Sequence, residues 1–236
     1  MPSIRPLHAC LLASLLGFLA ACASTPAPPI GPPQVPEQVS SADWEQDMRR
    51  FAETDVVAPP PEHAVLFIGS SSIRFWETLA TDFPDVATIN RGFGGSQIRD
   101  STWYADRIVV PYAPRMIVFY AGENDIESGR SPQQVHDDFA GFVTRVRRDL
   151  PRVRIAYISS KPSPLRVRMM EAEREANALI AADAARLKVQ FIDVFTPMLD
   201  ANGQPREELF REDRLHMNAT GYELWTRVVA PYLPAD

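Results

Sequence analysis

Short apolar runs alternate along this chain with segments whose apolar residues recur at helical spacing. The runs have the length of strands and lie at residues 64–68, 86–90, 116–121, 153–159 and 189–194. Strands that alternate with helices predict parallel pairing, right-handed crossovers and helices on both faces of one sheet. We therefore expect an α/β protein, a three-layer α/β/α sandwich with a five-stranded parallel sheet.

Helical spacing is found around Trp44–Phe51, after the first strand, and at residues 97–110, 132–150, 165–187 and 219–232. In a parallel sheet of this kind, the loops at the carboxyl ends of the strands share one edge, where ligands bind. Four loops rich in glycine and polar residues are expected at that edge. They lie at residues 69–71, 90–95, 122–125 and 213–216.

The stretch from Ala64 to Trp76, AVLFIGSSSIRFW, predicts a strand, a tight turn at Gly69 and a helix. Such a turn lifts a side chain above the carboxyl end of the sheet. It also places that side chain at a helix N-terminus, where free N–H groups favour negative charge. Ser71 is therefore a candidate nucleophile. The ordinary alternative is a serine that only caps a helix.

A serine nucleophile needs a base, and the chain has four histidines. His8 lies in the apolar N-terminal segment, His63 precedes the first strand, and His136 lies within an amphipathic helix. His216 follows the last strand and has Asp213 three residues upstream, a spacing that lets one loop bring the carboxylate to the imidazole. The alternative is an exposed histidine beside a capping aspartate.

An oxyanion hole needs two or three hydrogen-bond donors directed at the developing charge. The candidates are the backbone N–H groups of Ser71 and Gly95 and the side-chain amide of Asn124. Each of the last two residues has an ordinary alternative. Gly95 could simply permit a turn, and Asn124 could stabilise an Asx turn or cap a helix.

The four loops together resemble the blocks of the SGNH hydrolases, the GDSL esterase/lipase superfamily. The matching residues are Gly69-Ser70-Ser71, Asn90-Arg91-Gly92-Phe93-Gly94-Gly95, Gly122-Glu123-Asn124-Asp125 and Asp213-Arg214-Leu215-His216. The resemblance extends from about Val65 to Tyr232. It implies a flavodoxin-like hydrolase fold, a catalytic triad of Ser71, Asp213 and His216, and an oxyanion hole formed by Ser71, Gly95 and Asn124.

In one respect the chain departs from this family, because its usual Gly-Asp-Ser is Gly69-Ser70-Ser71 here. We assign Ser71 as the nucleophile since it lies two residues after the glycine, with Ser70 as the alternative. The loop at 90–95 and the following Ile98, Trp103 and Ile108 are similar to the platelet-activating-factor acetylhydrolase branch. That similarity implies a short acyl group such as acetyl.

The expected activity is hydrolysis of carboxylic esters through an acyl-enzyme, without a metal or cofactor. The substrate would be a small-molecule, glycan or lipid ester. Activity should fall in acid, when a protonated His216 cannot act as a base. The alternatives are a lysophospholipase or thioesterase acting on longer acyl chains, and a non-catalytic lipoprotein that binds envelope material. The net charge of −6 argues against a nucleic-acid partner.

The N-terminal segment is typical of a secreted lipoprotein. Arg5 precedes an apolar run, and Leu19-Ala20-Ala21-Cys22 resembles the bacterial lipobox, in which the chain is cut before a lipidated cysteine. A plain secretory signal or an uncleaved anchor are the alternatives. By resemblance to Gram-negative lipoproteins, Ala23 favours sorting to the outer membrane.

We therefore expect three segments. Residues 1–21 would be a lipoprotein signal peptide, residues 22–40 a lipidated cysteine and a proline-rich linker, and residues 41–236 the hydrolase domain. The acyl chains on Cys22 would hold the protein at the cell envelope, at the outer membrane facing the periplasm. The hydrophobic content of 45% is sufficient for one domain with a sizeable core.

Overall fold

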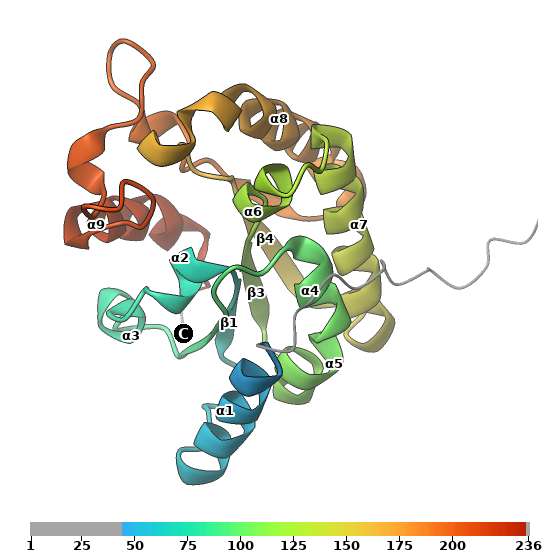
Figure 1. The fold of residues 1–236 in the computed structure, drawn as a ribbon. Helices are drawn as coiled ribbons and strands as arrows, with labels where there is room; N and C mark the ends of the chain where they lie inside the picture. Colours follow the sequence, from blue (N-terminus) through green and yellow to red (C-terminus); the bar gives the residue numbers. More distant parts are fainter. Residues whose placement is uncertain (1–43, 235–236) are drawn as a thin grey trace, which may run out of the picture. The chain divides into compact units, whose positions relative to one another are not determined.

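A computed structural model describes residues 44–234. Within them lies a five-stranded sheet in which every neighbouring pair of strands is parallel (Figure 1). The strand order is β2-β1-β3-β4-β5. The strands are β1 (Val65–Gly69), β2 (Thr88–Gly92), β3 (Met116–Tyr120), β4 (Arg154–Ile158) and β5 (Gln190–Ile192). The predicted α/β fold with a five-stranded parallel sheet is confirmed.

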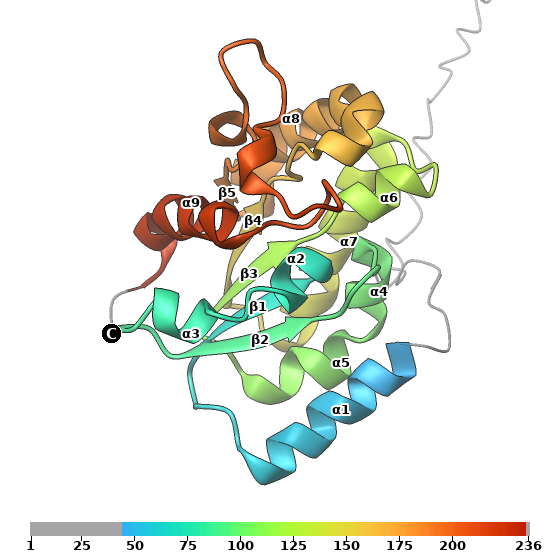
Figure 2. The ribbon, with the colours of Figure 1, turned by 60° about the vertical axis from the view of Figure 1, so that its left-hand side comes forward.

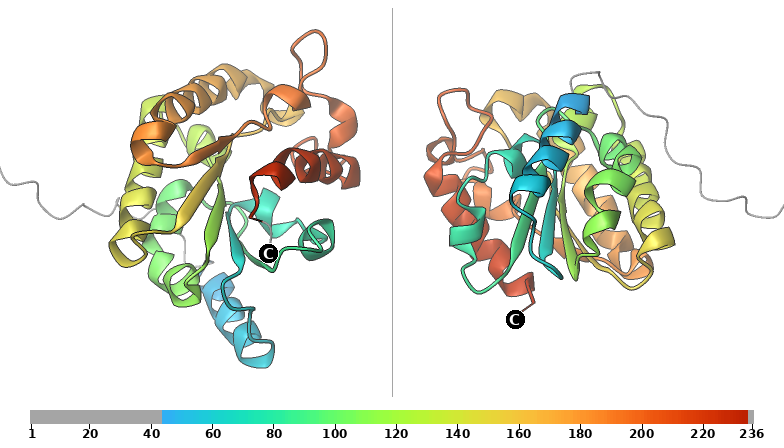
Figure 3. Two further views of the ribbon diagram at one scale, coloured as in Figure 1. Left: turned by 180° about the vertical axis from the view of Figure 1, so that it is seen from behind. Right: turned by 90° about the horizontal axis from the view of Figure 1, so that it is seen from below.

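Helices cover both faces of this sheet (Figures 2 and 3). One face packs against α1 (Trp44–Val57), α4 (Ile98–Trp103), α5 (Ala105–Ile108), α6 (Glu123–Glu127), α7 (Pro132–Asp149) and α8 (Met170–Leu187). The other packs against α2 (Ser71–Arg74), α3 (Leu79–Asp82) and α9 (Ala219–Val229). Short 3₁₀ helices are η1 (Val110–Tyr112), η2 (Pro164–Met169), η3 (Thr196–Met198), η4 (Glu207–Leu209) and η5 (Ala230–Tyr232).

Side chains of the central strands alternate between two apolar clusters, one on each face of the sheet. In β3, Ile117 and Phe119 belong to the first cluster, whereas Val118 and Tyr120 belong to the second. All five residues of β3 are fully buried. A strand covered on both faces has this continuously apolar sequence, which is why residues 116–121 gave the clearest strand prediction.

The helix predicted after the serine turn is shorter than its apolar spacing suggests. α2 ends at Arg74, after a single turn, and Leu79 lies in the separate helix α3. The side-chain amide of Asn90 donates a hydrogen bond of 2.7 Å to the Ile73 carbonyl. A continuing α-helix would offer that carbonyl to the N–H of Glu77. The β2 side chain therefore replaces a helical hydrogen bond.

Other predicted elements differ at their ends. The single helix expected at 97–110 is divided into α4, α5 and η1, and the helix expected at 165–187 begins as η2, inside which Arg166 is non-helical. The helix expected at 219–232 ends at Val229 and continues as η5, which contains Pro231. Proline has no N–H to donate to the preceding turn, so the α-helical ladder stops there.

The predicted signal peptide (residues 1–21) and the predicted lipidated cysteine and linker (residues 22–40) lie outside the described residues. Among the helices at residues 44–234, none has the length and apolar character that a membrane crossing requires.

Gly69 forms the sharp turn that joins β1 to α2. Its φ is +145°, and a Cβ at this position would lie 1.8 Å from the carbonyl oxygen of Tyr120. The next residue, Ser70, donates its N–H to that same oxygen at 3.0 Å. The chain can pass this close to β3 only because residue 69 has no side chain.

We predict that Gly69→Ala destabilises the protein far more than Gly203→Ala. Gly203 also has a positive φ, +74°, but a Cβ there would meet no atom within 4 Å. The free energy of unfolding of the control should therefore fall by only about 1 kcal/mol, the cost of a left-handed backbone at alanine. Gly69→Ala must also displace β3, so its free energy of unfolding should fall by about 3 kcal/mol or more. Urea unfolding measures both, and equal losses would contradict the close approach to Tyr120.

Candidate active site

Ser71 is the first residue of α2 and lies directly beyond the carboxyl end of β1. It is half-buried, whereas Ser70 and Ser72 on either side are buried. The Oγ atom of Ser71 lies 3.1 Å from Nε2 of His216. Among the three consecutive serines, Ser71 therefore makes the contact with the histidine. Because α2 has only one turn, its dipole contributes little, and its free N–H groups are what it offers an anion.

The second nitrogen of the His216 ring, Nδ1, lies 2.7 Å from Oδ2 of Asp213. The other carboxylate oxygen, Oδ1, accepts hydrogen bonds of 2.9 Å from the backbone N–H groups of Leu215 and His216. Burial opposes the charged carboxylate, but these hydrogen bonds and the His216 side chain lower the pKa of Asp213 to about 2. Asp213 is therefore ionised near neutral pH and fixes the orientation of the ring.

The loop that carries His216 is closed by its own hydrogen bonds and packs against Phe75. Arg211 donates its backbone N–H to the His216 carbonyl at 2.8 Å, and Phe210 forms an antiparallel bridge with Met217. The ring of Phe75 meets the imidazole edge to face, with centroids 4.9 Å apart. These contacts hold the imidazole next to Ser71 without help from a long helix or strand.

The glycine loop after β2 packs directly on α2. A Cβ on Gly92 would lie 2.2 Å from the backbone nitrogen of Arg74, and one on Gly94 would lie 3.9 Å from Cβ of Ser71. Asn90 stabilises this packing, because its Oδ1 accepts the N–H of Gly92 at 2.9 Å. The asparagine of the second block thus joins the glycine loop to the serine turn.

Gly95, the predicted oxyanion donor of this loop, has a positive φ of +81°. A Cβ at this position would meet no atom within 4 Å, so its side faces open space. The neighbouring Ser96 is buried and its carbonyl points to the third block. Gly95 is therefore exposed main chain between Gly94, which packs on α2, and Ser96, which contacts Asn124.

Asn124 lies in α6, just after β3, and its amide is held at both ends. Its Nδ2 donates to the Ser96 carbonyl at 3.0 Å, and its Oδ1 accepts from Nη1 of Arg166 at 3.1 Å. One amide hydrogen is used by Ser96, which leaves the second for another acceptor. The contacts made by Asn124 link three loops at the carboxyl edge of the sheet.

Arg166 is a residue that the sequence pattern did not single out. It belongs to η2, and only 14% of its side chain is exposed. Its guanidinium lies 3.8 Å from Glu123 and 3.7 Å from Glu127, longer than its hydrogen bond to Asn124. The only signal in the sequence is an arginine in the loop after the fourth strand.

Asp125 of the third block lies inside the protein. Its Oδ1 accepts the N–H of Ile98 at 3.0 Å and so connects α6 to the start of α4. Burial and the nearby carboxylates of Asp138 and Asp100 raise the pKa of Asp125 to about 7. Its role in the block is therefore to join two segments below the site.

The other two described histidines lie away from Ser71. His63 precedes β1, at the amino end of the sheet, as predicted. His136 contacts Asp137 at 2.8 Å and Asp183 of α8 at 2.9 Å. His136 therefore also has carboxylate partners, one adjacent in sequence and one 47 residues away. Within residues 44–234, no three acidic, histidine or cysteine side chains could share a metal ion.

A buried charged cluster lies beneath Asn124. Glu123 accepts hydrogen bonds of 2.5 Å from Lys161, Ser163 and Tyr120. Burial opposes its charge, but the ammonium of Lys161 lowers the pKa of Glu123. Lys161 is only 1% exposed, so this ion pair is removed from water and anchors the loop after β4 to the end of β3.

Glu173 of α8 faces the same cluster, yet neither of its carboxylate oxygens has a hydrogen-bond partner among residues 44–234. Burial and the negative charge of Glu123 raise the pKa of Glu173 to about 9. The unfolded chain would release this proton near pH 4.5, the ordinary value for glutamate. Between these pH values the folded protein binds the extra proton, so this residue lowers stability progressively as the pH rises.

We predict that Glu173→Gln becomes more stable relative to the parent protein as the pH rises from 5 to 9. The amide has a similar volume and cannot ionise, so it removes the pH-dependent cost. Thermal unfolding of both proteins at several pH values measures the difference. Glu171→Gln is the control, because Glu171 is exposed on the same helix. A difference that does not vary with pH would contradict a buried, protonated Glu173.

A family model described as the GDSL-like Lipase/Acylhydrolase family matches residues 68–224. The matched range includes Ser71, Gly95, Asn124, Asp213 and His216. A comparison with curated proteins gave no match.

Several solved structures share this fold. A protein from Streptococcus pneumonia, provisionally described as a platelet activating factor, has a TM-score of 0.72 at 23% identity, covering 80% of this chain and 92% of its own. A GDSL-like lipase from Bacteroides thetaiotaomicron VPI-5482 has a TM-score of 0.66 at 20% identity, and the match covers 78% of this chain and 96% of the lipase. A mutant of an acetyl-xylooligosaccharide esterase from Geobacillus Stearmophilus has a TM-score of 0.60 at 15% identity, and the match covers 73% of this chain and 94% of the esterase. At these low identities, the TM-scores establish a shared fold and nothing more.

Proposed function

This chain belongs to the GDSL-like lipase/acylhydrolase family and is an ester-hydrolysing enzyme, and we propose that it acts as a serine esterase through Ser71, His216 and Asp213. One observation carries this proposal. Hydrogen-bond distances of 3.1 and 2.7 Å connect the serine hydroxyl to the imidazole and the imidazole to an ionised carboxylate. This is the order of groups that activates a serine nucleophile.

In the proposed reaction, Oγ of Ser71 attacks the ester carbonyl carbon while Nε2 of His216 takes the hydroxyl proton. The tetrahedral intermediate then collapses, and the alcohol leaves with the proton that the imidazolium returns. Water attacks the acyl-enzyme by the same route and releases the acid and the free serine. Asp213 stays ionised throughout and stabilises the imidazolium that forms in both steps.

Three donors are proposed to stabilise the oxyanion: the backbone N–H groups of Ser71 and Gly95 and the side chain of Asn124. The packing of Gly94 against Ser71 supports the contribution of the glycine loop. Asn124 retains one amide hydrogen after its bond to Ser96. The Arg166 guanidinium contacts the amide oxygen, so it both fixes the rotamer and draws electron density away from the N–H groups.

For the substrate we propose a short acyl group of the acetyl type. A structural neighbour named as an acetyl-xylooligosaccharide esterase and another described as a platelet activating factor support this choice. One observation favours longer chains instead. Leu165 and Val167 of η2 are exposed, and Leu165 donates its N–H to the Arg214 carbonyl beside His216. Hydrolysis of p-nitrophenyl esters of increasing acyl length distinguishes the two, because only the first predicts the highest activity with acetate.

For its location we propose anchoring to the outer membrane, facing the periplasm, through lipid chains on Cys22. The support is the Leu19-Ala20-Ala21-Cys22 pattern and the following proline-rich segment. Replacement of Cys22 by serine should release the protein from the membrane fraction. An unchanged membrane-bound fraction would contradict the anchor.

We predict that Ser71→Ala lowers kcat by roughly 10⁶-fold, as in other enzymes that lose a triad serine. Ser70→Ala is the matched control, because Ser70 is adjacent but its side chain makes no capping hydrogen bond. This control should retain most of the activity. Steady-state hydrolysis of p-nitrophenyl acetate measures both. The reverse pattern would identify Ser70 as the nucleophile, and small losses in both would refute the proposal.

We predict a graded series at the oxyanion site. Asn124→Ala should lower kcat by roughly 10²–10³-fold, the usual contribution of one oxyanion donor. Arg166→Gln can still donate to the Asn124 oxygen, so it should retain more activity than Arg166→Met. The losses should appear in kcat with KM little changed, because the oxyanion exists only in the transition state. An effect of Arg166→Met confined to KM would contradict its positioning role.

A further inference from the structure

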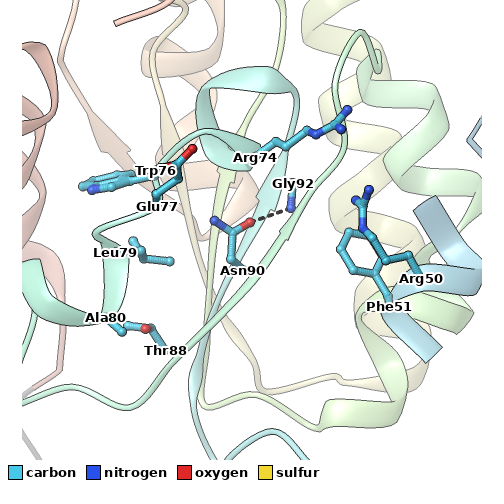
Figure 4. Close-up of a pocket in the computed structure, with 10 residues that line it drawn as sticks. All are labelled: Arg50, Phe51, Arg74, Trp76, Glu77, Leu79, Ala80, Thr88, Asn90 and Gly92. Atoms are coloured by element: carbon cyan, nitrogen blue, oxygen red, sulfur yellow. Dashed lines mark hydrogen bonds between the residues drawn. The ribbon is translucent and has the colours of Figure 1, made fainter. Parts of the chain in front are cut away.

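A cavity of about 440 Å³ lies beside the serine turn, between α1, α3 and the edge strand β2 (Figure 4). Its lining includes two arginines, Arg50 from α1 and Arg74 from α2, together with Asn90 and Thr88 of β2. One acidic residue, Glu77, also lines it. The cavity is separate from the Ser71–His216–Asp213 contacts but adjoins them through α2.

Arg74 connects this cavity to the candidate nucleophile. It follows Ser71 by three residues, about one helical turn, and therefore lies on the same side of α2. A Cβ built on Gly94 would lie 3.2 Å from Nη1 of Arg74 and 3.9 Å from Cβ of Ser71. The guanidinium and the serine thus flank the same glycine, so a small molecule bound to one reaches the other.

The charge of Arg74 is not balanced by a carboxylate. The side chain is exposed, and its contact within residues 44–234 is with the ring of Phe75, 5.8 Å from the guanidinium carbon. No carboxylate or carbonyl of those residues accepts a hydrogen bond from it. By contrast, Arg166 on the other side of the site lies near two glutamates. An arginine without a partner beside a nucleophile presents five N–H donors to a ligand.

Arg50 adds a second positive charge to the same side of the cavity. In Figure 4 its guanidinium and that of Arg74 lie toward the same end, whereas Glu77 lies toward the opposite end beside Trp76. Arg50 forms an ion pair of 2.5 Å with Asp47, and 48% of its side chain is exposed. Arg50 is therefore expected to attract an anion less strongly than Arg74, which contributes most of the attraction.

We propose that this cavity binds a carboxylate or phosphate group of the substrate, so that the natural substrate is an anionic ester. The inference rests on the proposed function, because it concerns the ester that Ser71 cleaves. An acetyl-type acyl group is too small to carry the anion, which therefore belongs to the alcohol part. Guanidinium groups match the geometry of both oxyanions and bind them through two parallel hydrogen bonds.

The test compares three acetyl esters that differ in one substituent: 4-acetoxybenzoate, 4-acetoxyphenyl phosphate and the neutral 4-acetoxybenzamide. The quantity measured is kcat/KM of each anionic ester divided by that of the neutral ester, which cancels changes shared by all three. Arg74→Gln should lower this ratio on the order of tenfold, the contribution of one charge-assisted hydrogen bond partly exposed to water. Arg50→Gln should lower it less.

Arg227→Gln is the matched control, because Arg227 is exposed on α9 and its replacement changes the net charge equally. Its ratio should equal that of the wild type. Above moderate ionic strength, further NaCl should lower the ratio in the wild type, since salt then screens the exposed ion pair itself. The benzoate and the phosphate ester distinguish the two anions, because the one that the cavity fits shows the larger ratio.

Two outcomes separate this proposal from the proposed function. If the wild type hydrolyses 4-acetoxybenzamide but Arg74→Gln leaves both ratios unchanged, the anion site is refuted and the esterase remains. If the wild type hydrolyses none of the esters, the proposed function fails. Titration of Ser71→Ala with benzoate and with inorganic phosphate then tests the cavity by binding alone. Binding that Arg74→Gln does not weaken, in the same Ser71→Ala protein, would overturn the proposal.

Discussion

The position of the candidate nucleophile depends on the contact between the serine turn and the backbone of β3. Gly69 passes so close to the Tyr120 carbonyl that no side chain is possible there, and Ser70 donates its N–H to the same oxygen. Asn90 then holds the one-turn helix that follows, by bonding to the Ile73 carbonyl from the neighbouring strand. A backbone contact between β1 and β3 and a side-chain contact from β2 thus determine where the Ser71 hydroxyl lies.

The opposite side of the site is built on buried charge. Glu123 and Lys161 form an ion pair away from water, directly beneath Asn124, and Ser163 and Tyr120 saturate the carboxylate. Such a pair adds little net stability, because desolvation of both ions offsets their attraction. It does fix the geometry, since any displacement of either partner leaves a charge unpaired in the interior. Arg166 fixes the Asn124 amide in the same way, by donating a hydrogen bond to its oxygen. Glu173, protonated in the same region, shows that the cluster accommodates only one negative carboxylate.

Apolar runs of strand length predicted the sheet, because β1 and β3 are buried on both faces and consist almost wholly of apolar residues. Spacing also indicated Ser71, Asp213 and His216, since the loops at 69–71 and 213–216 each contain a local pattern. The sequence could not reveal Arg166 or the division of the helix at 97–110. The contact made by Arg166 depends on Asn124, which lies 42 residues away in the chain. The same holds for one of the two carboxylate partners of His136, Asp183, which comes from α8. Local patterns predict elements and turns, whereas polar contacts between loops require the assembled fold.

The overall charge and the proposed anion site act on a substrate in opposite directions. The chain carries a formal charge of −6, so its field repels an anion at long range. Arg74 attracts the same anion, but only at the distance of a hydrogen bond. Salt screens the long-range repulsion more strongly than the close contact, because the Debye length is about 8 Å at physiological ionic strength. Association of an anionic ester with this enzyme is therefore expected to be fastest at moderate salt, where repulsion is reduced and the contact with Arg74 persists. A neutral ester meets neither effect, so the charge of the substrate, more than its size, determines how it approaches Ser71.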